Sequence, residues 1–295
     1  MGPSLYFCAV ELSYLSDEAL TTFIDRALQE DVGDGDHSSL GAFPASTQHS
    51  AQLLIKDNGI LAGVALGLRI FAHVDPELSV DVRLEDGMAV QKGQVALTVS
   101  GKAQSILTAE RLVLNCMQRM SGIATYTHKL NQLIAGTGAR LLDTRKTTPN
   151  FRICEKWAVA IGGGTNHRYG LYDMVMLKDN HIDFAGGIAQ AVSSVQDYLK
   201  SKGKDLRIEV ETRNLDEVRQ VLACEGVDVI MLDNMSPALM REAVGIIGDR
   251  CETEASGGIT ESTIRAVAET GVDFISVGAL THSAMPLDLS LKAIS

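Results

Sequence analysis

Basic side chains crowd into residues 143–181 of a chain whose formal net charge is -11. They are Arg145, Lys146, His167, Arg168, Lys178 and His181. Cations about 4 Å apart repel each other by roughly 4 kcal/mol per pair at an effective dielectric constant of about 20, so a site that gathers several is expected to bind a polyanion. The pattern predicts a ligand rich in carboxylate or phosphate.

Short apolar segments beyond residue 138 end beside these cations, or beside other polar residues and glycine. The segments ARLLDT, DMVMLK, LRIEVE, VDVIMLD, TEAS and VDFISVG are typical of buried strands, and they end near Arg145, Lys178, Glu211, Asp233, Ser256 and Gly278. The last three intervals between these ends are roughly 22 residues, the length of one βα unit, and the two earlier ones leave room for a longer loop. This spacing predicts a parallel α/β barrel, or part of one, with the end residues at the carboxyl-terminal edge that carries the chemistry of such barrels.

Capping signals between the strands support this alternation. Asn214 and Glu217 form a predicted capping box before the helical segment LDEVRQVLA, and Ser236 followed by Pro237 predicts another helix start. We expect the barrel to span residues 116–282.

The first part of the chain has a different organisation. Residues 51–100 contain strand-like segments around one short helix, and residues 104–135 are helical with a break at Ser121-Gly122. A smaller α/β domain over residues 1–115 is expected.

Composition limits the class of protein. With 295 residues, 45% hydrophobic residues and 6 prolines, the chain can bury a large core. Its acidic balance argues against nucleic acid or anionic lipid as a partner, because both require a basic surface. No apolar run approaches the roughly 20 residues that span a membrane, and the N-terminus MGPSLYFCAVELSYL has no basic leader region. The cysteines are Cys8, Cys116, Cys154, Cys224 and Cys251, and they form no CxxC pair. We therefore expect no disulfides and no zinc site, as in proteins of the reducing cytoplasm.

Each candidate residue also has a structural interpretation. Arg145 and Lys146 are ordinary loop cations when taken singly, but they directly follow a strand, where an unpaired buried charge is costly. We favour anion binding, because Arg presents a planar fork to carboxylate or phosphate and Lys a point charge. Lys178 at a strand end suits either phosphate binding or Schiff-base chemistry.

Glycine-rich segments carry the same ambiguity. Gly162-Gly163-Gly164 either end a helix or let the backbone approach a ligand to which His167 and Arg168 project. Two loops at later strand ends expose backbone N–H groups before predicted helices, as phosphate sites do. Their residues are Ser256, Gly257 and Gly258 in one loop and Gly278 in the other.

Two acids end adjacent predicted strands. Glu211 and Asp233 either neutralise Arg145 or Lys178, or they bind sugar hydroxyls, a developing positive sugar carbon or Mg²⁺. The chain contains no nucleophile triad, HExxH, zinc spacing or GxGxxG motif.

Long motifs in a fixed order resemble the quinolinate phosphoribosyltransferase family. They cover most of the chain, from EDVGDGDHSS through TAERLVLNCMQRMSGIAT, LLDTRKTTPNFR, EKWAVAIGGGTNHRYGLYD, MLKDNHI, EVET, IMLDNM and EASGGI to ISVGALTHS. The resemblance implies an N-terminal α/β sandwich domain, to which the tail 283–295 returns, and an incomplete, seven-stranded α/β barrel. It also implies a homodimer, with further assembly to a hexamer left open, in which one subunit's N-terminal region closes the other's barrel mouth.

The resemblance implies which residues hold quinolinate. They are Arg145, His167, Arg168, Lys178 and, from the partner subunit, Arg111. One departure is Asn150, where the family commonly has glycine after TTP, and Asn tolerates the same left-handed backbone.

The same resemblance implies the catalytic and phosphate-binding residues. Lys146 and Lys178 would lie near the diphosphate of phosphoribosyl pyrophosphate, while Glu211 and Asp233 would face the ribose and Mg²⁺, directly or through water. The 5-phosphate would be held by Ser256, Gly257, Gly258 and Gly278.

The implied reaction belongs to de novo NAD biosynthesis. Quinolinate and phosphoribosyl pyrophosphate would give nicotinate mononucleotide, diphosphate and CO2. From the residues alone three alternatives stay open: a related phosphoribosyltransferase for another pyridine or azole, a class I aldolase that uses Lys178, and a non-catalytic phosphoribosyl pyrophosphate sensor.

Overall fold

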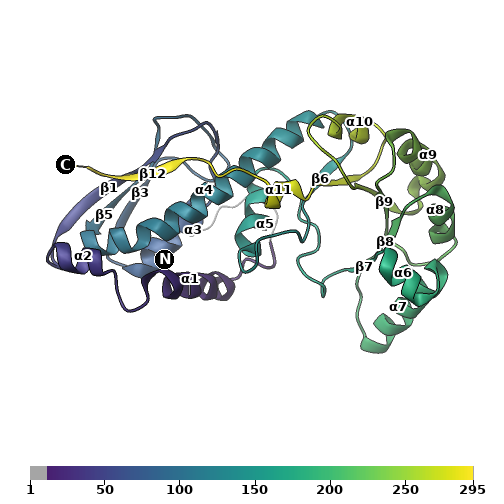
Figure 1. Ribbon diagram of the computed structural model, residues 1–295, viewed down its shortest axis with the longest axis horizontal. Coiled ribbons are helices and arrows are strands. Elements are labelled where there is room, and N and C mark those ends of the chain that lie inside the picture. The colour runs from purple at the N-terminus through teal and green to yellow at the C-terminus, as the bar shows by residue number, and fades with distance from the viewer. Residues whose placement is uncertain (1–11, 295) are drawn as a thin grey trace. The chain divides into compact units, whose positions relative to one another are not determined.

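The computed structural model describes residues 12–294, and the chain divides into two compact units (Figure 1). Cys8 and most of the segment MGPSLYFCAVELSYL therefore lie outside the described residues. Unit 1 comprises Met1–Ser121, Pro149–Ala158 and Pro286–Ser295, and unit 2 comprises Gly122–Thr148 and Val159–Met285. In the described residues, no helix is both long enough and apolar enough to cross a membrane.

Unit 1 is built on a four-stranded antiparallel sheet in the order β12-β1-β5-β3. Its strands are β1 (Gln48–Ile55), β3 (Ser79–Val82), β5 (Val95–Lys102) and β12 (Leu289–Ile294). From Ala51 onward every second side chain of β1 is buried, as expected for a sheet with one face on the core, and these are Ala51, Leu53 and Ile55. A two-stranded pair, β2 (Gly59–Ile60) and β4 (Ala89–Val90), lies outside this sheet.

Helices accompany the sheet of unit 1. They are α1 (Asp17–Val32), α2 (His37–Ala42), α3 (Val64–Val74) and the first part of α4 (Ala103–Leu133). The expected break at Ser121-Gly122 does not occur, because α4 continues through both residues. The Ser121 hydroxyl instead accepts from Ala62 N at 2.9 Å and donates to Ala62 O, so the serine ties α4 to the chain before α3.

Unit 2 contains a parallel six-stranded sheet in the order β6-β11-β10-β9-β8-β7. Its strands are β6 (Arg140–Leu142), β7 (Val175–Leu177), β8 (Ile208–Thr212), β9 (Val229–Asp233), β10 (Glu252–Ser256) and β11 (Phe274–Ser276). The predicted α/β fold, with a smaller sheet domain and a parallel α/β domain, is confirmed. In place of a seventh full strand, Thr165 makes one parallel bridge to Leu142, on the free side of β6.

Helices follow the strands of unit 2. They are α5 (Arg152–Ile161, shared with unit 1), α6 (Asp179–Ala185), α7 (Ile188–Lys202), α8 (Leu215–Leu222), α9 (Pro237–Ile247), the 3-10 turn η1 (Gly248–Arg250), α10 (Ile264–Ala268) and α11 (Ala279–His282). Ser236 caps α9 by accepting from Leu239 N, with Pro237 at the first helical position, as predicted. Asn214 likewise accepts from Glu217 N, but the Glu217 carboxylate reaches back to Arg213 N, one residue before the cap, rather than to Asn214 N.

The strand interiors explain why this sheet is covered on both faces. The β9 residues Ile230 and Leu232 are fully buried on one face of the sheet, and Met231 is buried on the other. Continuous burial of this kind is typical of strands in parallel sheets, and in β9 the first polar residue, Asp233, comes at the strand end.

Candidate active site

The carboxyl ends of the six parallel strands place most of the predicted residues in unit 2. Asp233 and Ser256 are the last residues of β9 and β10, Lys178 directly follows β7, and Glu211 lies one residue before the end of β8. Parallel strands end at one edge of a sheet, so these side chains share that edge. Arg111 lies on α4 within unit 1 and is exposed.

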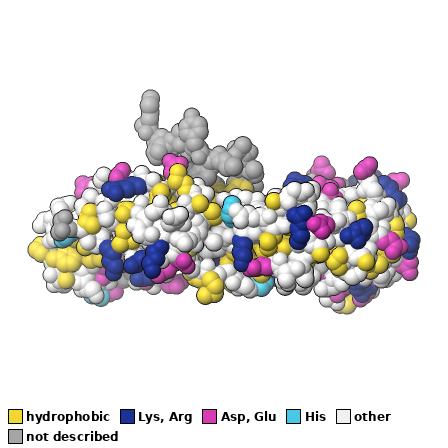
Figure 2. Space-filling view, turned by 90° about the horizontal axis from the view of Figure 1, so that it is seen from above, with side chains coloured by type: hydrophobic (Ala, Val, Ile, Leu, Met, Phe, Trp, Pro, Cys, Tyr) yellow, Lys and Arg dark blue, Asp and Glu magenta, His cyan; other side chains and the backbone are white. Residues whose placement is uncertain are grey.

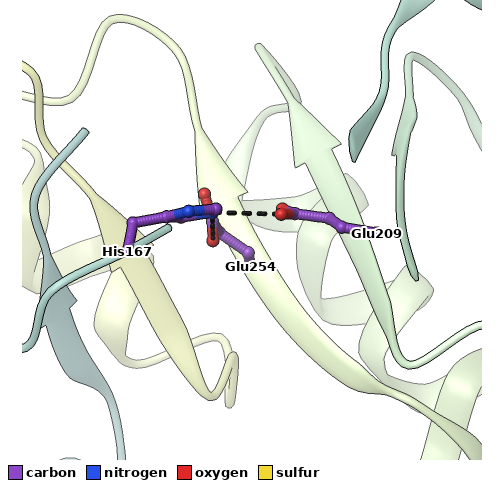
Figure 3. A group of neighbouring side chains, drawn as sticks. All are labelled: His167, Glu209 and Glu254. Carbon is purple, nitrogen blue, oxygen red and sulfur yellow. Dashed lines mark hydrogen bonds and ion pairs between the residues drawn. The ribbon is translucent and has the colours of Figure 1, made fainter. Parts of the chain in front are cut away.

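A buried histidine between two glutamates forms the centre of unit 2 (Figure 3). His167 Nε2 lies 3.0 Å from Glu209 Oε2 and 3.3 Å from Glu254 Oε2. The exposed fractions of the three side chains are 7%, 0% and 2%. The other carboxylate oxygens, Glu209 Oε1 and Glu254 Oε1, are buried without a hydrogen-bond partner, so the negative charge of the pair is directed at the histidine.

The two glutamates determine the charge of His167. Burial alone would lower its pKa, but hydrogen bonds and charges from Glu209 and Glu254 outweigh burial and raise the pKa of His167 to about 10. Arg168 N donates to His167 Nδ1 at 2.6 Å, a contact that by itself suits a neutral ring. Two buried carboxylates outweigh one peptide dipole, so we take the imidazolium as the neutral-pH form.

Glu209, the glutamate that lies closer to His167, also has a shifted pKa. Burial, and next the negative charge of Glu254, raise the pKa of Glu209 to about 7. The cluster therefore holds fewer negative charges at neutral pH than two free carboxylates would carry.

The loop that carries His167 is held by an aspartate. His167 N donates to Asp143 Oδ1 at 2.9 Å, and Asn166 Nδ2 donates to Asp143 Oδ2 at 2.7 Å. Asp143 directly follows β6 and is fully buried. The end of β6 thus fixes the start of the segment from Asn166 to Arg168.

The preceding glycines serve packing rather than ligand approach. A Cβ at Gly162 would lie 2.5 Å from Ala124 O on α4, and one at Gly164 would lie 2.7 Å from Val159 Cγ1. Gly163 has a φ of 85°, as a residue ending a helix commonly does. Of the two interpretations of this triplet, the structure favours the turn after α5.

Two guanidinium groups lie close enough to influence each other. Burial, and then the positive charge of Arg145, lower the pKa of Arg168. Arg168 Nη1 donates to Met174 O at 3.1 Å, and Nη2 contacts Met176 Sδ. Within residues 12–294, Arg168 forms no ion pair with a carboxylate. Guanidinium groups are well suited to binding carboxylate or phosphate, and these two are half-buried and near each other.

The two predicted acids are neighbours, as adjacent strand ends require. Burial, and then the charge of Asp233, raise the pKa of Glu211. Lys178 Nζ lies 3.9 Å from Glu211 Oε2, a long ion pair in which the lysine is about half exposed. This contact supports in part the structural interpretation, in which the acids neutralise Lys178. The donor set, two carboxylates beside a basic group, also suits a hard divalent cation that carries phosphate.

The two predicted phosphate loops, Ser256–Gly258 and the loop at Gly278, require glycine for different physical reasons. Gly257 and Gly258 have φ values of 91° and 61°, which favour glycine. Gly278 has an ordinary φ of -61°, but its Cβ would lie 3.0 Å from Lys146 Cδ and 3.2 Å from His282 Nε2. Space for Lys146 and His282, rather than backbone angle, requires this glycine.

One detail of the first phosphate loop was predicted wrongly. The segment after Gly258 does not lead directly into a helix, because α10 begins only at Ile264. Thr260 N donates to Thr263 Oγ1 at 2.9 Å, and this side-chain hydrogen bond stabilises a turn instead of a helical start. The loop therefore presents its own backbone N–H groups, rather than a helix N-terminus, at this strand end.

Sequence reasoning missed several residues of this site. They are Asp143, Glu209, Asn234, Glu254 and His282. The available signal was a glutamate inside each of the strand segments LRIEVE and TEAS, since charged side chains at buried strand positions need a partner. His282 gave no signal of its own.

Basic and acidic side chains are intermixed on one face of the molecule. On the face that Figure 2 draws, dark blue and magenta groups alternate over both units among the described residues. That face offers no continuous basic stripe of the kind that nucleic acid requires.

Comparisons with known proteins agree with these features. A family model described as "Quinolinate phosphoribosyl transferase, C-terminal domain" matches residues 123–292, and one described as the N-terminal domain matches residues 34–121. A relative from Arabidopsis thaliana, named nicotinate-nucleotide pyrophosphorylase [carboxylating], chloroplastic, is 49% identical over 92% of this chain and 82% of its own length. Quinolinate phosphoribosyltransferase [decarboxylating] 1b from Nicotiana tabacum is 48% identical, over 91% and 81%. A solved nicotinate-nucleotide pyrophosphorylase from Francisella tularensis has a TM-score of 0.89 and 37% identity, over 97% of this chain and 100% of that one.

Proposed function

The chain belongs to the quinolinate phosphoribosyltransferase family, and from this premise we propose that it transfers the phosphoribosyl group of phosphoribosyl pyrophosphate to quinolinate with loss of CO2. Products are nicotinate mononucleotide, diphosphate and CO2, and the reaction serves de novo NAD biosynthesis. The observation that carries the proposal is the pair of guanidinium groups, Arg145 and Arg168, within a unit whose strand ends also carry two acids and two glycine loops.

The basic residues bind and orient the dicarboxylate. Arg145 and Arg168 offer planar N–H forks to the two carboxylates of quinolinate, and Lys178 and the His167 imidazolium add positive charge. Binding by several cations fixes the pyridine ring so that its nitrogen faces the anomeric carbon, which lowers the entropic part of the barrier.

The acids and the loops hold the phosphoribosyl donor. Glu211 and Asp233 stabilise the positive charge that develops on the sugar ring as the bond to diphosphate breaks, and Lys146 stabilises the departing diphosphate. Backbone N–H groups of the Ser256–Gly258 and Gly278 loops bind the 5-phosphate.

Decarboxylation follows from the same arrangement. After glycosylation the positively charged ring nitrogen stabilises the carbanion left at C2 when the 2-carboxylate departs as CO2, and a proton taken up from solvent at C2 completes nicotinate mononucleotide. The cations that bind the other carboxylate hold the ring in place during this step.

Mg²⁺ is the metal that this donor set fits. Glu211 and Asp233 would hold it, directly or through water, because adjacent carboxylates beside a phosphate site are the usual environment of this ion. When bound, Mg²⁺ neutralises charge on the diphosphate leaving group.

Oligomeric state and compartment complete the proposal. A homodimer would let Arg111 of one subunit serve the site of the other, as the family resemblance implies. The cysteines of the described residues, Cys116, Cys154, Cys224 and Cys251, are free thiols, which supports a reducing compartment such as the cytoplasm.

Substrate preference distinguishes the proposed activity from that of a related phosphoribosyltransferase that acts on another pyridine or azole. Purified protein is incubated with phosphoribosyl pyrophosphate, Mg²⁺ and either quinolinate or nicotinate, and the nucleotide product is identified by mass spectrometry. Nicotinate mononucleotide from quinolinate alone supports the proposal, whereas equal or faster use of nicotinate supports the alternative.

A further inference from the structure

Asn234 follows the site acid Asp233 in a backbone conformation that few residues adopt. Its φ is 53°, and within residues 12–294 only Asn150, at 63°, is another non-glycine residue with positive φ. Asparagine tolerates this region better than most side chains. Asn234 is exposed, so burial in the core does not explain its presence.

The side chain of Asn234 contacts two parts of the site at once. Its Nδ2 donates to Asp233 Oδ2 at 2.7 Å. A carboxylate only accepts, so this bond orients the amide and turns Oδ1 away from Asp233. Oδ1 then occupies the space beside Gly257, where a Cβ would lie only 2.3 Å away.

The backbone of Asn234 reinforces this connection. Asn234 N donates to Ser256 O at 2.9 Å, which ties the end of β9 to the end of β10. One residue therefore bonds to the acid at one strand end and packs against the glycine loop at the next.

From these contacts we propose that Asn234 is a positioning residue, which fixes the Asp233 carboxylate relative to the Ser256–Gly258 loop. It thereby sets the spacing between the groups that hold the ribose and the 5-phosphate of one phosphoribosyl pyrophosphate molecule. The inference rests on the proposed function, because that function assigns both groups to this substrate. Losing the amide frees the carboxylate to rotate and the loop to shift, and small displacements of this kind weaken catalysis strongly.

A purely structural role would make Asn234 only a turn residue. Asn234→Gly separates the two roles, because glycine keeps the left-handed backbone and removes only the amide. Asn234→Asp keeps the shape of the side chain but sets a second carboxylate against Asp233. Asn150→Gly is the matched control, since it makes the same change at the other left-handed asparagine.

Equilibrium binding is the main readout. Calorimetry measures the dissociation constant of phosphoribosyl pyrophosphate with Mg²⁺ in the absence of quinolinate, and steady-state kinetics give KM for each substrate. We expect binding of phosphoribosyl pyrophosphate to weaken about 10-fold in Asn234→Gly and further in Asn234→Asp, with KM for quinolinate changed less than about 2-fold. Asn150→Gly should bind as the wild type does.

Two results would overturn the inference. One is wild-type binding of phosphoribosyl pyrophosphate by both Asn234 variants, and the other is an equal weakening for quinolinate and phosphoribosyl pyrophosphate. A wild type that binds phosphoribosyl pyrophosphate but makes no nicotinate mononucleotide refutes the proposed transfer, while the binding comparison still decides the role of Asn234. A wild type that does not bind phosphoribosyl pyrophosphate refutes both.

Discussion

The Lys146 side chain lies directly against Gly278, so that a Cβ at Gly278 would be 3.0 Å from Lys146 Cδ. A hydrogen bond also joins α11 to the loop after β6, because Thr281 Oγ1 donates to Lys146 O at 2.9 Å. The loop after β6 and the loop after β11 therefore act as one support for a lysine assigned to the diphosphate. β11 also pairs with β6 in the sheet, which is why residues so distant in sequence meet here.

Gly278→Ala tests this support. The added methyl group displaces Lys146 without straining the backbone, since the φ of Gly278 is one that alanine adopts freely. We expect kcat to fall about 10-fold or more, as for other small displacements of catalytic groups, with little change in melting temperature. Gly245→Ala on α9, where a Cβ meets nothing within 4 Å, is the control and should retain full activity.

Arg145→Ala and Arg168→Ala test the dicarboxylate site. A hydrogen bond to a charged group contributes about 1.5–3 kcal/mol, so each change should raise KM for quinolinate roughly 10- to 100-fold. The fold should stay intact, because neither side chain belongs to the apolar core. An unchanged KM for quinolinate in Arg145→Ala would refute its assigned role.

Glu254→Gln tests the charge of His167. The folded-state pKa of about 10 exceeds the ordinary value of 6.5, so the stability that protonated His167 contributes is fully present below pH 6.5 and is lost as pH rises through 10. The raised pKa of Glu209, about 7, acts in a lower window, between 4.5 and 7. Above pH 7 the free energy of unfolding should therefore fall in the wild type, and in Glu254→Gln the fall should be smaller and end at lower pH.

Urea unfolding between pH 7 and pH 10 measures this difference. Glu261→Gln is the control, because its exposed ion pair with Lys129 contributes at most about 1 kcal/mol. Parallel curves for the wild type and Glu254→Gln would show that Glu254 does not hold a proton on His167.

Asp233→Asn tests the acids that face the sugar. Removing a group that stabilises transition-state charge typically lowers kcat about 10²- to 10³-fold. The Mg²⁺ concentration for half-maximal activity should also rise, because one of the two proposed ligands is weakened. Asp216→Asn, which changes an exposed acid paired with Arg219 on α8, should leave both quantities unchanged.

Subunit mixing tests the assignment of Arg111 to the partner's site. At quinolinate concentrations near the wild-type KM, Arg111→Ala and Arg145→Ala should each show little activity alone. If each site combines Arg111 of one subunit with Arg145 of the other, mixed dimers contain one site with both arginines, and activity should return on mixing. Activity that stays at the level of the separate variants would contradict the shared site.

The sequence predicted the strand ends well because they follow from local pattern. β9 ends at Asp233 and β10 at Ser256, as the apolar segments and their spacing predicted. In β9 the four residues before Asp233 are buried, so this first polar residue marks the edge of the sheet. The positions of Arg145 and Lys178 after β6 and β7 were predictable for the same reason.

The buried centre of unit 2 was not predictable from local pattern. The partners of His167 come from β8 and β10, and only the folded sheet brings Glu209 and Glu254 to one ring nitrogen. The reason for Gly278 was equally hidden, since it depends on Lys146 from a distant loop. Local hydrogen bonds of Thr260 also overrode the helical pattern before α10.

The most direct test of the central claim is the stoichiometry of the reaction with quinolinate labelled in its 2-carboxyl group. Wild-type protein, phosphoribosyl pyrophosphate and Mg²⁺ are combined with this substrate, and labelled CO2, diphosphate and nicotinate mononucleotide are quantified together. We predict equal amounts of all three products, and none when either substrate is omitted. Diphosphate release without labelled CO2, or no release of either product, would contradict the account.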